Sequence, residues 1–134
     1  MKSLFTLLLI ISFTNVFAQT DTVISKRIID PTAMVAGSFG GQIQAAKFKA
    51  ARKIELAGVS ADSAIVISYM FYASGKGFES GPQYIHVVKG NLFTKEVIEI
   101  LEKAKPGTTI VIDEIKVAYR NRNKMVPSLT FQLY

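Results

Sequence analysis

Residues 64–72 have the sequence Ala64-Ile65-Val66-Ile67-Ser68-Tyr69-Met70-Phe71-Tyr72. β-Branched and aromatic residues fill this stretch, and turn-forming residues flank it on both sides. The composition predicts a strand, which we expect to lie in the centre of a sheet. Similar stretches predict further strands at 84–88 and 109–117, a short one at 26–31, and an alternating last strand at 129–133.

Two helices are predicted around these strands. Good helix formers at 45–53 predict a short helix, with Phe48 and Ala51 facing inward. Thr94 is a typical N-cap for a second helix, which Pro106 ends and which carries an apolar stripe made by Val97, Ile98 and Leu101. The sequence therefore predicts a mainly β domain of the α+β class, an antiparallel sandwich or partly open barrel with two short helices.

The N-terminus has the order of a secretory signal peptide. Lys2 precedes an uncharged apolar run at 4–17, and the small Ala18 closes it. This run is too short for a spanning helix, which needs about 20 apolar residues. We expect cleavage after Ala18, which leaves 19–134 as one domain that does not span the membrane and that works in the periplasm, or secreted to the cell surface.

The charge of the chain limits the classes of partner that we expect, and its cysteine content limits the kinds of site. The chain carries 16 basic and 10 acidic residues, so an envelope protein of this composition favours acidic partners: an acidic protein face, an acidic glycan or an anionic lipid surface. Nucleic acid is not expected in that compartment. The chain has no cysteine, which excludes disulfides, thiolate metal sites and a thiol nucleophile.

The candidates for chemistry are few. His86 is the one histidine, and strand alternation predicts that it shares a face with Tyr84 and Val88. Asp113 and Glu114 are adjacent on a predicted strand, so we expect them on opposite faces. No nucleophile elbow accompanies His86. We therefore expect no catalytic, metal or cofactor site; a small periplasmic hydrolase using His86, or a glycan-binding protein, is the alternative.

The glycine-rich segment 37–41 could form a phosphate loop or a structural turn. A phosphate loop would open directly into a helix N-terminus, whereas residues 42–44 separate these glycines from the predicted helix. Glycine also supplies the positive backbone torsions that turns require. We therefore predict a turn.

One cluster of positive charge remains, at Tyr119, Arg120, Arg122 and Lys124. It falls between the last two predicted strands, so we expect residues 120–124 to form a polar hairpin tip. A hairpin kept soluble by its charges would have this composition, and so would a contact for an acidic partner. The four residues are the candidate contact residues.

Two blocks of sequence carry a family pattern. The first contains Val35-Ala36-Gly37, Gly40-Gly41 and Ile43, and the second contains Lys103-Ala104-Lys105-Pro106-Gly107 followed by Ile112-Asp113-Glu114-Ile115-Lys116. Together they resemble the C-terminal domain of the gliding-motility protein GldM.

The resemblance implies a mainly β domain at the distal periplasmic end of a type IX secretion and gliding complex. Its implied partners are outer-membrane-associated ring proteins, and it implies no catalytic residues. A full-length family member also has a membrane helix and preceding periplasmic domains, so its motor function is not implied for this chain.

Overall fold

The computed structural model describes residues 30–58 and 63–134. These residues form, in order, β1 (Thr32–Met34), β2 (Gly41–Ile43), α2 (Ala45–Ala50), β3 (Glu55–Ala57), β4 (Ala64–Gly75), β5 (Gln83–Lys89), α3 (Lys95–Lys103), β6 (Thr108–Tyr119), β7 (Arg122–Val126) and β8 (Leu129–Leu133). The predicted mainly β fold with two short helices is confirmed. The predicted signal peptide at 1–18 and nearly all of the predicted strand at 26–31 lie outside the described residues.

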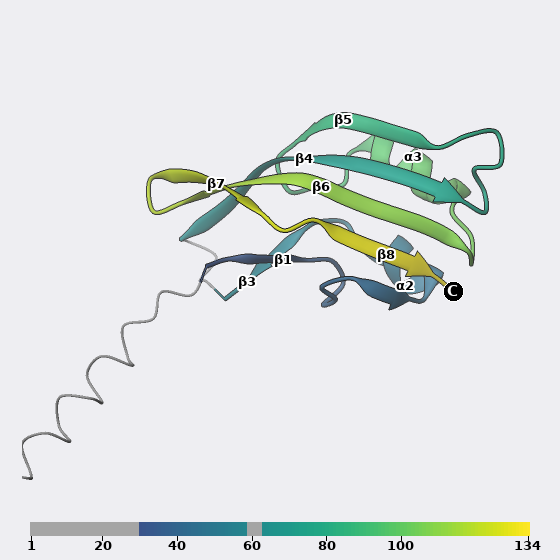
Figure 1. Cartoon of the computed structure of the whole chain (residues 1–134), viewed down its shortest axis with the longest axis horizontal. Coiled ribbons are helices and arrows are strands. Elements are labelled where there is room, and N and C mark those ends of the chain that lie inside the picture. Colours follow the sequence, from purple (N-terminus) through teal and green to yellow (C-terminus); the bar gives the residue numbers. More distant parts are fainter. Residues whose placement is uncertain (1–29, 59–62) are drawn as a thin grey trace, which may run out of the picture.

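The strands form two sheets. The larger has the order β2-β8-β6-β4-β5, with β7 also pairing with β6, and β1 pairs with β3 in a small second sheet (Figure 1). The long strands β4 and β6 lie side by side in its middle, which confirms the central place predicted for 64–72. Since β2 and β5 are edges of an open path, the larger sheet does not close into a barrel.

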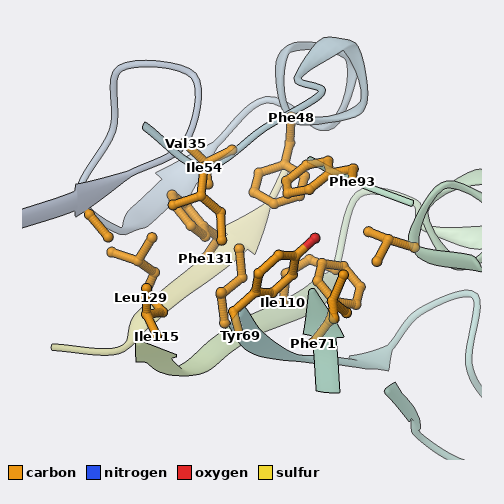
Figure 2. Packing of buried hydrophobic residues seen from close by; sticks show 14 of the residues in the cluster. Val35, Phe48, Ile54, Tyr69, Phe71, Phe93, Ile110, Ile115, Leu129 and Phe131 are labelled. Atoms are coloured by element: carbon orange, nitrogen blue, oxygen red, sulfur yellow. The ribbon is translucent and has the colours of Figure 1, made fainter. Parts of the chain in front are cut away.

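One face of the larger sheet carries the core. Phe48 of α2 is fully buried, and its ring lies 5.0 Å from that of Phe131 on β8 and 6.2 Å from that of Phe93. Figure 2 shows these rings grouped with Tyr69 and Phe71 of β4. The inward position predicted for Phe48 is confirmed. The helix itself ends at Ala50, earlier than predicted, and its C-cap Ala51 is only partly buried.

The second helix matches its prediction closely. The Thr94 hydroxyl accepts a hydrogen bond from the Val97 amide at 3.5 Å and caps α3. Val97 and Leu101 are buried, and Ile98 packs at the margin of the core. Ile100, which the predicted stripe left out, is also buried. Because α3 packs on the sheet through these side chains, its position depends on apolar contact more than on helix propensity.

β-Bulges shift which side chains face the core. Between the pairs Ser68–Lys116 and Met70–Asp113, β6 has one residue more than β4, and Glu114 takes a φ of 47° there. Ile112 and Ile115 are both buried as a result, although strict alternation would separate them. Asp113 and Glu114 between them both lie outside the core, so the prediction of opposite faces was wrong.

A second bulge moves His86. β5 has an extra residue between the pairs Phe71–Ile85 and Tyr69–Val88. Val88 is therefore buried, while Tyr84 and His86 are exposed with their rings 4.6 Å apart. His86 shares a face with Tyr84 as predicted, but not with Val88.

The glycine-rich segment is a turn, as predicted. Val35 and Ser38 exchange two backbone hydrogen bonds of 3.0 and 2.9 Å around Ala36 and Gly37, both with positive φ. Gly40 follows with a φ of 128° and lies against β8, where a Cβ would meet the Thr130 carbonyl oxygen at 3.1 Å. Glycine is required at this position by both torsion and space.

Candidate functional site

The candidate contact residues lie on the β6–β7 hairpin, at the end of the larger sheet away from the C-terminus (Figure 1). The chain reverses through Arg120 and Asn121 alone, with φ values of 50° and 62°. Two left-handed residues in succession make the tight turn whose twist matches antiparallel strands. The predicted tip at 120–124 was therefore too long, because Arg122 and Lys124 belong to strand β7.

The pairing of β6 with β7 fixes the faces of these side chains. Tyr119 is opposite Arg122, and Val117 is opposite Lys124. Val117 and Tyr119 are both buried, so Arg122 and Lys124 point to the same side of the hairpin as the core. The short turn thus gathers three cations around the position of Tyr119.

Tyr119 is the centre of this group. Its side chain is 5% exposed. The Arg120 guanidinium carbon lies 5.2 Å from the centroid of its ring, and the Lys124 ammonium nitrogen lies 5.8 Å from it. Both distances are within the range of cation–π attraction, which holds two like charges close to one apolar surface.

A hollow of about 330 Å³ is lined by Tyr119, Arg120, Arg122 and Lys124. These are the four candidate contact residues that the sequence analysis identified, and all of them lie on one concave surface of the structure. Two guanidinium groups present planar forks that suit carboxylate, sulfate or phosphate oxygens. The hollow is therefore suited to an anionic group.

One of the cations is already paired. The Lys124 ammonium group lies 2.9 Å from a carboxylate oxygen of Asp30, with 42% and 68% of the two side chains exposed. Exposed ion pairs of this kind contribute about 0–1 kcal/mol. This ion pair links the start of the described domain to β7. Of the three hairpin cations, Arg120 and Arg122 make no ion pair with an acidic side chain of the described residues.

The other candidates are placed apart from this hollow. His86 lies on β5 and is not among the residues that line the hollow of the hairpin. Another hollow, of about 380 Å³, lies between β3 and the start of β4 and is lined by Met34, Lys53, Ile54, Glu55, Leu56, Ala64, Ile65, Val66 and Asn91. Its polar side chains are those of Lys53, Glu55 and Asn91, with no histidine or hydroxyl nucleophile among them.

The described residues contain neither a metal-binding cluster nor a membrane-spanning helix. They contain no group of three or more His, Asp and Glu side chains that could hold a metal ion. None of their helices is long and apolar enough to cross a membrane.

Comparison with known protein families and with curated proteins gave no match to this chain. The resemblance to the C-terminal domain of GldM therefore rests on the two sequence blocks alone. The candidate site rests on the geometry of the hairpin.

Strand β7 is the part of the site that sequence reasoning missed. Residues 122–125 are all exposed and mainly polar, so they lack the apolar alternation that marks a half-buried strand. The available signal was Asn121, a residue that tolerates the left-handed conformation of a two-residue turn.

Proposed function

We propose that this chain is an exported, non-enzymatic binding module of the bacterial envelope, and that it contacts an acidic partner through the β6–β7 hairpin. The observation that carries the proposal is the hollow formed by Tyr119, Arg120, Arg122 and Lys124. Four residues from a two-residue turn and its flanking strands converge there, with Arg120 and Lys124 held over a buried ring.

The cellular setting of the proposal comes from the sequence. The leader at 1–18 supports export, and the resemblance to the GldM C-terminal domain supports a partner within the type IX secretion and gliding machinery. Outer-membrane-associated ring proteins are the first partners to test. The proposal takes the contact role from that family, without its motor function.

Electrostatics suits such a role. A cluster of exposed cations raises the rate at which an acidic partner arrives, and it selects against basic partners. Arginine over an aromatic ring is also the kind of residue that dominates binding energy at protein interfaces. The hairpin thus has the composition of a contact surface as well as its charge.

The proposal is tested by site-specific photo-crosslinking in the native host. The photoreactive residue replaces Asn121, which lies between the cations without being one of them. We expect one discrete adduct with an envelope protein, and we expect Arg120→Glu with Arg122→Glu to abolish it. The same probe at Gln132, an exposed residue of β8 that pairs with the start of β6 at the other end of that strand from the hairpin, is the control.

Adducts with cytoplasmic proteins only, or an adduct that survives the double charge reversal, would refute the proposal. A melting curve for the double variant is required alongside. Both substitutions are at exposed positions, where stability changes are usually within about 0.5 kcal/mol.

A further inference from the structure

Lys124 already holds a carboxylate that belongs to this chain. Its ammonium nitrogen lies 2.9 Å from a carboxylate oxygen of Asp30, which is 94 positions away along the chain. The same nitrogen lies 5.8 Å from the centroid of the Tyr119 ring. We call the surface lined by Tyr119, Arg120, Arg122 and Lys124 the basic hollow. An acidic side chain of the domain is therefore bound at the border of the surface that an acidic partner would use.

This ion pair is weak enough to be exchanged for another. The two side chains are 42% and 68% exposed, so water competes for both charges. An exposed ion pair of this kind changes an equilibrium by no more than about fivefold. Arg120 and Arg122 make no ion pair with an acidic side chain of the described residues, so they are open to a first contact with an acidic partner.

Two carboxylates at Lys124 would repel each other. A lysine ammonium group has three N–H donors, so a second carboxylate could reach it beside Asp30. The two carboxylates would then lie within about 6 Å of each other, a distance at which like charges disfavour one another. A partner that brings its own acid to Lys124 must displace Asp30 or bind against its charge. In both cases Asp30 lowers the affinity of the basic hollow.

We propose that Asp30 is an internal competitor for the basic hollow, and that a carboxylate of the partner replaces it at Lys124. This inference rests on the proposed function and concerns the regulation of the same site. Asp30 directly precedes Pro31 and β1, so the exchange frees the start of the described domain from β7. Binding at the hairpin and release of this end of the domain are then coupled, and each favours the other.

The alternative role for Asp30 is a clamp that holds the hairpin in its binding shape. Removal of a clamp would loosen Lys124 and lower the affinity of the basic hollow, whereas removal of a competitor raises it. The sign of the change therefore separates the two roles. The geometry favours a competitor, because the two-residue turn and the pairing of β6 with β7 hold the hairpin without Asp30.

The test titrates the full exported protein with a peptide of four glutamates blocked at both ends, and it follows the backbone amide NMR signals of residues 120–124. A peptide of four glutamines is the neutral control. We expect Asp30→Asn to bind the glutamate peptide about two- to fivefold more tightly than the native protein at low salt. Glu102→Gln removes the same charge from an exposed position on α3, away from the hairpin (Figure 1), and should change the affinity by less than about 1.5-fold.

A double-mutant cycle locates the effect at Lys124. In the Lys124→Gln background Asp30 has no ammonium group to occupy, so adding Asp30→Asn should change the affinity by less than about 1.5-fold. Both substitutions are at exposed positions and keep the side chains polar. All variants should therefore melt within a few degrees of the native protein, which a thermal unfolding curve checks.

The outcomes separate this inference from the proposed function. If the native protein binds the glutamate peptide and Asp30→Asn binds it equally or more weakly, the competitor is overturned and the basic contact stands. Equal gains from Asp30→Asn and Glu102→Gln, or a gain that persists in the Lys124→Gln background, also overturn the competitor, because the effect is then one of net charge. A glutamate peptide that shifts no signal at 120–124 in either protein, or that binds no more tightly than the glutamine peptide, overturns both.

Discussion

Gly40 and Gly81 offer a matched test of the close contact between the glycine-rich turn and β8. Their φ values are 128° and 132°, so an L-residue is strained to a similar degree at both. A Cβ at Gly40 would lie 3.1 Å from the Thr130 carbonyl oxygen, whereas a Cβ at Gly81 would meet nothing within 4 Å. Gly81→Ala therefore measures the torsional strain alone, and Gly40→Ala measures the strain and the contact together.

The expected sizes follow from these two terms. Holding an L-residue in a disfavoured backbone region costs about 1–3 kcal/mol, so the free energy of unfolding of both variants should fall by this amount. Crowding a packed backbone adds about 1–3 kcal/mol, which applies to Gly40→Ala alone. In a domain of about 100 residues each kcal/mol lowers Tm by about 4 °C. Gly40→Ala should thus melt about 4–12 °C below Gly81→Ala.

Thermal and urea unfolding of both variants, followed by circular dichroism, are the assays. The urea series gives the free energy of unfolding directly, and equal slopes would show that the unfolded states are comparable. If the two variants lose the same stability, the approach of Gly40 to β8 contributes nothing. The glycine-rich segment would then be required for its torsions only.

Three further predictions concern the core and the hairpin. Leu101→Ala should cost about 2–5 kcal/mol because this side chain is buried, and the partly buried Ile98→Ala should cost clearly less; equal losses by urea unfolding would place α3 differently on the sheet. Burial raises the pKa of the Tyr69 phenol, whose hydroxyl donates to the Leu92 carbonyl at 2.8 Å. Because the pKa of Tyr69 is higher in the folded state than in the unfolded state, the stability that its buried neutral phenol contributes is fully present below about pH 10 and is lost as the pH rises further. Tyr69→Phe should therefore make the fall of Tm at alkaline pH shallower, and an unchanged fall would contradict this. Asn121→Gly should stabilise the left-handed turn by up to about 1 kcal/mol, and a lower Tm would count against the turn geometry.

The long apolar strands and α3 were predictable because their signals are local. Residues 64–72 combine β-branched and aromatic side chains, and Thr94 is a cap followed by an apolar stripe. Such patterns decide an element without reference to its neighbours. The central position of β4 and the packing of α3 followed from them.

The bulges were not predictable from alternation. Each depends on a register between two strands, so the extra residue at Glu114 or beside His86 has no local signature. Every side-chain face assigned beyond a bulge is then reversed. This is why the predicted faces of Glu114 and Val88 were wrong.

The basic cluster was predictable as a composition but not as a surface. Its four residues were identified from charge and spacing, whereas the hollow depends on the turn being only two residues long.

The measurement that tests the central claim most directly is the affinity of the purified domain for its crosslinked envelope partner as a function of salt. Exposed charges are screened over about 10 Å at 0.1 M salt, so a contact made by Arg120 and Arg122 must weaken as salt rises. We predict a steep fall for the native protein, and for Arg120→Glu with Arg122→Glu an affinity at least about tenfold lower at low salt. An affinity that is independent of salt, and equal in the native protein and the double variant, would contradict the account.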